Sequence, residues 1–168
     1  QEAAAAVAKP LNLQDDMHVG AAEAVTAALV AYPEWSGTSV EARADCLDRL
    51  ADLLEENRSQ LMALAVQEAR KTIPDALSEV REAIDFCRYY AARARNDLRP
   101  IELPGPTGER NVLRHEGRGV WIAIAPWNFP LAIFLGQVVA ALVAGNTVVA
   151  KPAPQTTAIG RFAVKLAH

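Results

Sequence analysis

The sequence has few cysteines and no excess of positive charge. Cys46 and Cys87 are its two cysteines, and they lie too far apart to indicate a disulfide framework or a zinc site. The formal net charge at pH 7 is −3, so no basic surface is expected and nucleic acid is not an expected partner. A chain without a disulfide framework is typical of a reducing compartment. We therefore expect a cytoplasmic protein that does not bind nucleic acid.

Charge is absent altogether from the segment Gly119–Ala150. Its length alone would suggest a membrane span. However, Pro126, Asn128, Pro130 and the Gly145–Asn146 pair divide it into pieces that are too short to cross a bilayer. The segment therefore predicts a buried strand–helix–strand unit and no membrane span.

The first residues also lack a targeting signal. Gln1–Pro10 is rich in alanine and contains one lysine, without the arginines of a transit peptide or the apolar core of a signal peptide. Residues 1–20 are expected to form a linker or tail. The chain starts at Gln1 and stops at His168 inside a helical pattern that has no cap. We therefore expect a piece of a longer protein, with the remainder of that protein as its partner.

Helical patterns fill residues 21–98. Leu47, Leu50 and Leu54 form one apolar stripe at helical spacing. The segment Thr38–Glu41 has the spacing of a capping box, in which Glu41 reaches back to the start of the helix. The predicted helices are Ala21–Tyr32 before Pro33, one from the capping box to about Asn57, Gln60–Glu68, and one with Pro74 in its first turn that ends near Ala94.

From residue 99 the pattern changes to short strands. Ile101–Leu103 and Asn111–His115 lie on either side of the turn-rich segment Pro104–Gly108. Residues 99–117 are therefore expected to form a two-strand excursion.

Residues 118–168 have the pattern of a parallel α/β domain. Two continuous apolar strands joined by a helix indicate a right-handed crossover with both faces covered. Two strands do not complete a sheet, so the domain is expected to be truncated. The sequence therefore predicts an α/β fold. Of this fold it supplies a helical N-terminal segment, the two-strand excursion and the first β-α-β of a Rossmann-like domain. The predicted elements are a strand at Val120–Ala125, a helix at Leu131–Ala144, a strand at Thr147–Ala150 and a helix at Thr156–Leu166.

Two polar residues follow the predicted parallel strands. In open α/β sheets, ligands bind beyond the carboxyl ends of the strands. Asn128 follows the first strand, and Lys151 follows the second as the only cation of this region. A structural alternative remains for each, because Asn128 could cap the helix that Pro130 helps to start and Lys151 could mark where the strand reaches water. Neither a G-x-G-x-x-G fingerprint nor a P-loop is present to decide.

These two segments resemble the aldehyde dehydrogenase superfamily. The matching motifs are Pro126–Pro130, with the letters PWNFP, and Gly145–Pro152, with the letters GNTVVAKP. The spacing from Asn128 to Lys151 also matches the family. The resemblance extends back through Glu68–Thr72 and Glu79–Ala91, so that it covers nearly the whole chain after Ala21.

One segment resembles a particular branch of the superfamily. Leu103–Asn111, with the letters LPGPTGERN, is similar to the dehydrogenase module of the bacterial proline utilization A family. This resemblance implies a small-molecule aldehyde substrate, L-glutamate γ-semialdehyde, which is oxidised to glutamate in proline catabolism. Dehydrogenases for succinic semialdehyde or betaine aldehyde remain alternatives, and so does a non-catalytic binding or assembly segment.

The resemblance assigns roles to residues at the strand ends. In the family, a cysteine thiolate attacks the aldehyde, and the side-chain amide at the position of Asn128 donates to the oxyanion. Phe129 would line the apolar stem of the aldehyde. The residues implied at the NAD or NADP cofactor are Ile124, Ala125, Pro126, Trp127, Lys151, Ala153 and Pro154.

Pro154 departs from the family pattern. The family commonly has a glutamate three residues after the lysine, where it binds the ribose 2′-hydroxyl. Proline can neither accept that hydrogen bond nor repel a 2′-phosphate. The resemblance therefore implies NAD but does not exclude NADP.

A face of the long predicted helix mixes carboxylates with aromatic rings. Glu79, Glu82, Phe86 and Tyr89 fall along it. Related semialdehyde dehydrogenases place a glutamate of this helix near the aldehyde tunnel, and Glu82 is the position that matches, where it would bind the substrate ammonium. The alternative is a surface carboxylate paired with Arg81 or another neighbouring arginine.

Neither cysteine is expected to be a nucleophile. Cys87 shares a helical stripe with Val80 and Ile84, and Cys46 lies beside Leu50, so both are expected in the core. The resemblance places the catalytic cysteine and glutamate downstream, so this segment alone is expected to be inactive. It also implies that the excursion at residues 99–117 belongs to the oligomerisation region of a homo-oligomer. No metal site is expected.

Overall fold

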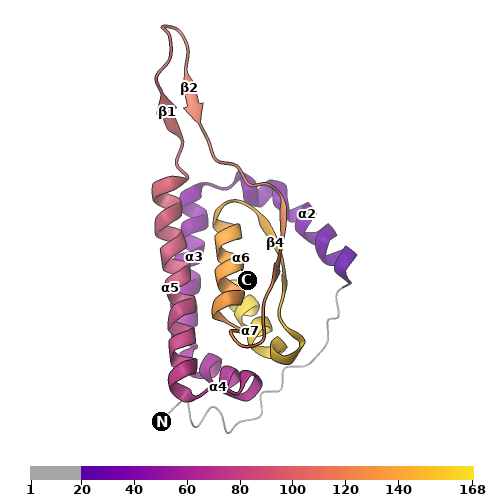
Figure 1. Ribbon diagram of the computed structural model, residues 1–168. Helices are drawn as coiled ribbons and strands as arrows, with labels where there is room; N and C mark the ends of the chain where they lie inside the picture. The colour runs from indigo at the N-terminus through magenta and orange to yellow at the C-terminus, as the bar shows by residue number, and fades with distance from the viewer. Residues whose placement is uncertain (1–19) are drawn as a thin grey trace.

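Helices α3 (Val40–Glu56) and α5 (Ile73–Asp97) lie side by side in the computed structural model, which describes residues 20–168 (Figure 1). The stripe of Leu47, Leu50 and Leu54 is buried against α5, as predicted. The tail predicted at residues 1–20 lies outside the described residues except for Gly20. Amphipathic helices of this kind are stabilised mainly by burial of their apolar faces.

Ion pairs close the exposed edge between α3 and α5. The guanidinium of Arg95 contacts the carboxylates of Glu41, Asp45 and Asp48 on α3. These hydrogen bonds raise the pKa of Arg95, and Asp48 makes the largest contribution. Arg95 is thus the centre of an interhelical ion-pair network.

The capping box predicted at the start of α3 is wrong. Ser39 is the N-cap, and its hydroxyl oxygen accepts a hydrogen bond from the backbone nitrogen of Ala42 at 3.1 Å. Glu41 therefore occupies the second helical position, and its carboxylate pairs with Arg95 and not with the helix start. The prediction that Pro74 lies in the first turn of α5 is confirmed, and the structure shows in addition that Thr72 caps this helix.

Helix α2 (Ala21–Gly37) continues past Pro33, where the sequence predicted its end. Tertiary hydrogen bonds hold the turn around the proline. The hydroxyl of Tyr32 donates to the carbonyl of Gly117, and the indole nitrogen of Trp35 donates to the carbonyl of Leu142 at 2.9 Å. These contacts stabilise a helical turn that proline disfavours.

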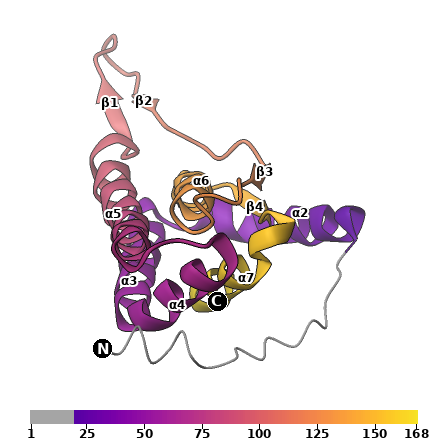
Figure 2. The ribbon, with the colours of Figure 1, turned by 60° about the horizontal axis from the view of Figure 1, so that its bottom comes forward.

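Strands β1 (Ile101–Leu103) and β2 (Asn111–Leu113) form an antiparallel pair with Ile101 opposite Leu113. The pair extends away from the rest of the chain beyond the end of α5 (Figures 1 and 2). Ile101, Leu103 and Leu113 are each nearly half exposed. The predicted excursion is confirmed, with a second strand two residues shorter than expected.

The parallel unit consists of β3 (Val120–Ile124), α6 (Ala132–Val143) and β4 (Thr147–Lys151), with Val120 opposite Thr147. It matches the predicted strand–helix–strand order. Helix α6 and helix α2 contact the two strands from opposite sides (Figure 2). Helix α4 (Arg58–Ala69) packs on α5, and the short helix η1 (Pro154–Thr156) leads into α7 (Thr157–Ala167).

The turn between α6 and β4 depends on the Gly145–Asn146 pair. Gly145 has a φ of 88°, which disfavours a side chain. The side-chain oxygen of Asn146 accepts hydrogen bonds from the backbone nitrogens of Arg118 and Gly119 at 2.6 and 3.2 Å. This buried amide fixes the start of β3 beside the start of β4.

Strand β3 is incompletely covered within residues 20–168, and its edge away from β4 is unpaired there. Trp121, Ile122 and Ile124 are 51%, 61% and 61% exposed, although the sequence predicted burial on both faces. No described strand other than β4 pairs with β3. Among the described helices, none is both long enough and apolar enough to span a membrane.

Candidate functional site

The carboxyl ends of β3 and β4 lie side by side, as the parallel arrangement requires. Ile124 is opposite Lys151, and the backbone nitrogen of Ala125 donates to the carbonyl of Lys151 at 3.2 Å. The segments 125–130 and 151–154 therefore leave the sheet from one edge. The structure thus brings together most of the residues that the sequence assigned to the site.

Asn128 lies in the turn between β3 and α6, and it is exposed. The N-cap residue of α6 is Leu131, whose side chain makes no capping hydrogen bond. The structural alternative, in which Asn128 caps this helix, is therefore wrong. Within residues 20–168, no hydrogen bond engages the side-chain amide of Asn128, so both of its N–H groups can reach an external acceptor.

Glu79 performs the capping that was considered for Asn128. Its Oε1 atom accepts hydrogen bonds from the backbone nitrogens of Leu131 and Ala132 at 2.8 and 3.3 Å. Its Oε2 atom lies 3.0 Å from Nζ of Lys71. Anionic groups stabilise helix N-termini because unpaired N–H groups point toward them.

Glu79 was predicted on the same helix face as Glu82, but the two differ in burial: Glu79 is 1% exposed and packs against α6, whereas Glu82 is exposed. Its neighbours one turn away on α5, Ala76 and Ala83, are fully buried and small, and they leave room for its carboxylate beside α6. This pair of alanines at positions i−3 and i+4 was the available signal in the sequence. It was insufficient because the partner amides are more than 50 residues away.

Phe129 lies next to Asn128 in the turn and is 39% exposed. The ammonium of Lys71 lies 4.1 Å from the centre of its ring, which is a cation–π distance. One face of the ring is therefore fixed by a cation. Its role in lining the aldehyde stem stays a prediction.

The end of β4 presents one cation. Lys151 is exposed, and its Nζ atom lies 3.4 Å from the carbonyl oxygen of Pro152. No ion pair with a carboxylate engages Lys151 in the described part of the chain. Pro154 is exposed at the start of η1, whereas Ala153 is 7% exposed and offers little surface to a ligand.

The residues at the end of β3 differ in their exposure. Ile124 and Trp127 are 61% and 54% exposed, Pro126 is partly buried, and Ala125 is buried at 6%. A ligand lying across this edge could contact the first two through side chains. It could reach Ala125 mainly through the backbone.

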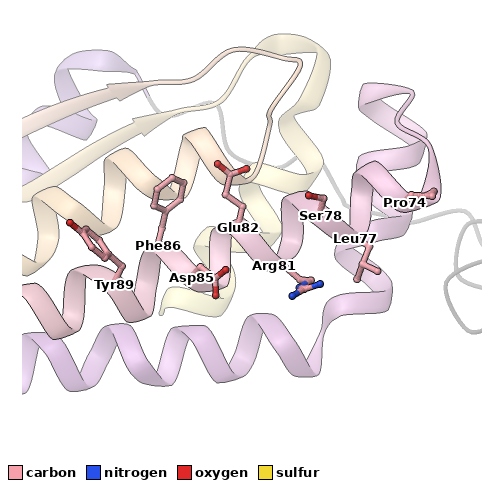
Figure 3. A pocket seen from close by; sticks show the side chains of 8 residues that line it. All are labelled: Pro74, Leu77, Ser78, Arg81, Glu82, Asp85, Phe86 and Tyr89. Atoms are coloured by element: carbon pink, nitrogen blue, oxygen red, sulfur yellow. The ribbon is translucent and has the colours of Figure 1, made fainter.

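A groove of about 720 Å³ runs along the exposed side of α5 (Figure 3). Glu82 and Phe86 extend to the same side of the helix, and Arg81 extends to the opposite side. The ring of Phe86 stacks on that of Tyr90 and lies so close to Gly136 of α6 that a Cβ there would approach it to 3.1 Å. The groove is lined by Pro74, Leu77, Ser78, Arg81, Glu82, Asp85, Phe86 and Tyr89.

Glu82 has no hydrogen bond or ion pair within the described residues, so the predicted alternative of pairing with Arg81 or a neighbour is not present. It follows Glu79 by three residues, which is just under one helical turn. Glu79 accepts a hydrogen bond from the backbone nitrogen of Leu131, which directly follows the loop that carries Asn128. Glu82 therefore lies about one helical turn along α5 from that contact. The expected mixture of carboxylate and aromatic side chains is present in Glu82, Phe86 and Tyr89.

The two cysteines differ in their surroundings. Cys87 is fully buried, as predicted, and burial together with the charge of Asp48 raises the pKa of its thiol to about 12. Cys46 is only partly buried, so its assignment to the core is wrong. No group of acidic, histidine or cysteine side chains in residues 20–168 has the arrangement of a metal site.

The comparison with known proteins covers nearly the whole chain. The model of the aldehyde dehydrogenase family matches residues 11–168. The bifunctional protein PutA of Klebsiella aerogenes is 43% identical over 144 residues, which are 86% of this chain and 10% of that protein. The chain thus spans about a tenth of the length of this curated relative.

Solved structures agree in fold. A crystal structure of a bifunctional proline utilization A (PutA) protein superposes with a TM-score of 0.93 at 50% identity, covering 100% of this chain and 18% of the other. A 1-pyrroline-5-carboxylate dehydrogenase from Thermus with bound NAD gives a TM-score of 0.84 at 36% identity, covering 88% and 29%. The predicted fold class is confirmed, and the chain belongs to the aldehyde dehydrogenase family.

Proposed function

We propose that this chain is part of a longer protein, called here the parent protein, whose dehydrogenase activity oxidises L-glutamate γ-semialdehyde to glutamate with NAD. The observation that carries the proposal is that the exposed, unengaged amide of Asn128 and the exposed cation of Lys151 occur where two neighbouring strands end at the same sheet edge. The similarity to PutA proteins and to a 1-pyrroline-5-carboxylate dehydrogenase with bound NAD supports the substrate and the cofactor.

Asn128 serves as an oxyanion donor in this proposal. Attack of a thiolate on the aldehyde carbon turns the carbonyl oxygen into an oxyanion, and a fixed N–H donor lowers the barrier to that step. Cys87 cannot supply the thiolate because it is buried with a raised pKa. The family resemblance places the nucleophile and the glutamate that activates water in the remainder of the parent protein, so we expect this chain alone to be inactive.

The edge of the sheet fits a dinucleotide. Exposed side chains of Ile124 and Trp127 offer apolar contacts, and Lys151 offers a donor for ribose hydroxyls. NAD would supply the acceptor for the hydride that leaves the tetrahedral adduct. Pro154 is exposed nearby, and its side chain carries neither a hydrogen-bond acceptor for the ribose 2′-hydroxyl nor a charge that would repel a 2′-phosphate, so the proposal does not exclude NADP.

Glu82 is the residue proposed to select the substrate. Glutamate semialdehyde carries an α-ammonium, and a carboxylate without an internal partner is suited to bind it. Phe86 and Phe129 would contact the carbon chain between the two ends of the substrate. The protruding β1–β2 pair, with its exposed apolar side chains, is proposed to contact a second copy of the parent protein.

The test is an assay of the purified parent protein for NADH formation with three aldehydes. Glutamate semialdehyde should give a kcat/KM at least tenfold above that for succinic semialdehyde and betaine aldehyde. A preference for either of the other two would reassign the substrate. Absence of turnover with all three, in a folded parent that contains the downstream residues, would favour the non-catalytic assembly role instead.

A further inference from the structure

The turn that carries Asn128 is held from behind by a buried pair of opposite charges. Lys71 and Glu79 have side chains that are 11% and 1% exposed, with 3.0 Å between Nζ and Oε2. Neither residue lies on the turn itself. The pair contacts the turn at two places, the ring of Phe129 and the amides of Leu131 and Ala132.

These two contacts fix the turn on the carboxyl side of Asn128. Lys71 lies over the ring of Phe129, which directly follows Asn128, and Glu79 accepts a hydrogen bond from the backbone nitrogen of Leu131, three residues beyond Asn128. On the amino side, Ala125 is fixed by its hydrogen bond to Lys151. Asn128 is therefore an exposed residue of a turn whose two ends are anchored, and its side-chain amide has no hydrogen-bond partner within the described residues.

Lys71 reaches its place through an unusual backbone conformation. Arg70 ends helix α4 with a φ of 57°, and it is the only residue other than glycine with a positive φ in residues 20–168. This left-handed residue reverses the chain and directs Lys71 inward to the carboxylate of Glu79. Conformations of this kind persist where surrounding contacts hold them.

A second glutamate shows what simple helix capping looks like in the same fold. Glu68 accepts hydrogen bonds from the amides of Ala158 and Ile159 at the start of α7. No described cation pairs with Glu68, and no aromatic ring joins it. The addition of Lys71 and Phe129 at the Glu79 site is therefore more than capping requires.

We propose that Lys71 and Glu79 are positioning residues, which preorganise the turn so that the amide of Asn128 points at the developing oxyanion. The inference rests on the proposed role of Asn128. Loss of a donor's orientation affects the transition state more than the ground state. Removing the pair should therefore lower kcat, with little change in the KM for NAD.

The test is a double-mutant cycle in the parent protein between Lys71→Met and Asn128→Ala. Lys71→Met keeps the length of the side chain but removes the charge, and it should lower kcat at least tenfold. If Lys71 acts through Asn128, Lys71→Met should lower kcat by less than threefold once Asn128 is alanine. If the double variant instead shows the full product of the two single losses in kcat, Lys71 does not act through Asn128. That result would overturn the inference while leaving the proposed function intact.

Glu68→Gln is the matched control, because it weakens the cap of α7 without touching the turn. Its effect on kcat, whatever its size, should multiply with that of Asn128→Ala. Glu68→Gln could instead couple to Asn128→Ala as strongly as Lys71→Met does. In that case any loosened helix would produce the coupling, and the inference would also be overturned. Unchanged kcat for Asn128→Ala itself would remove the proposed function of Asn128 and the inference with it.

Phe129→Leu provides a second variant in case Lys71→Met fails to fold. It removes the ring below Lys71 from a partly exposed position, and it should lower kcat less than Lys71→Met does and show the same coupling to Asn128. Hydrogen exchange of the peptide that spans residues 126–135 gives a readout besides activity. Both variants should raise its exchange rate, whereas Glu68→Gln should raise that of α7 only; unchanged exchange of residues 126–135 in both variants would overturn the inference.

Discussion

The carboxylate of Glu68 on α4 lies 2.9 Å from the backbone nitrogens of both Ala158 and Ile159 on α7. Each oxygen accepts one hydrogen bond, so the pair is bidentate. The interaction ties a helix that precedes the sheet to the helix that follows β4, about 90 residues later in the chain.

Replacing Glu68 with alanine should loosen the first turn of α7. Loss of a side-chain cap costs about 1–2 kcal/mol, because buried N–H groups are left without partners. Hydrogen exchange of the amides of Ala158 and Ile159 in the parent protein should accelerate by about one order of magnitude. Glu68→Gln keeps one acceptor oxygen and should show a smaller increase. Equal protection in all three proteins would contradict the capping role.

Sequence patterns were sufficient for the order of the elements but not for the caps that connect them. Apolar periodicity predicted α3, α5, α6 and both parallel strands, because each depends on local spacing. The contacts of Glu68 and Glu79 join residues about 50 to 90 positions apart, and no local pattern contains such a distance. Helix α2 likewise continued through Pro33 because its anchors, Gly117 and Leu142, are remote in sequence.

Asn128→Ala in the parent protein should lower kcat by about two to three orders of magnitude, as expected for the loss of one oxyanion donor. The KM for NAD should change little, because the proposed partner of the amide is the substrate and not the cofactor. Steady-state kinetics with glutamate semialdehyde, together with NAD binding measured by calorimetry, separates the two effects. An unchanged kcat would leave Asn128 without a role, since the structure has already excluded it as the helix cap.

Lys151→Ala should act mainly on the cofactor. Removing a donor to ribose hydroxyls should raise the KM for NAD about tenfold, a typical effect of one lost hydrogen bond to a charged group, and change kcat little. Pro154→Glu is the informative companion, because a carboxylate there would repel a 2′-phosphate. It should lower kcat/KM for NADP and leave that for NAD equal or higher. A loss with both cofactors would indicate damage to η1 instead of altered selectivity.

The cysteines should differ in their reaction with iodoacetamide at pH 8. Alkylation requires the thiolate, and the raised pKa of Cys87 together with its full burial keeps that residue protonated and inaccessible. Cys46 is partly exposed and should react in the native protein, whereas Cys87 should react only after denaturation. Because folding raises the pKa of Cys87 above 9, its contribution to stability is present below that pH and is lost as the pH rises toward 12. Mass spectrometry of digested native protein checks the order of labelling.

Glu82 provides the test of substrate selection. The groove along α5 holds a second carboxylate, Asp85, which extends to a different side from Glu82 (Figure 3). Asp85→Asn therefore removes the same charge from the same groove without affecting the proposed ammonium site. Any general effect of net charge on the groove should appear in both variants.

Glu82→Gln in the parent protein should raise the KM for glutamate semialdehyde about tenfold or more, because the ammonium would then donate to a neutral amide oxygen and not to a carboxylate. Propanal has no ammonium, so its kinetic constants should stay within about twofold, and Asp85→Asn should leave both substrates near wild-type values. The ratio of kcat/KM for the two aldehydes is the quantity to measure, because it cancels any loss of folded enzyme. Equal losses with both aldehydes would make Glu82 a structural residue of α5, and an unchanged ratio in an active enzyme would remove it from the substrate site.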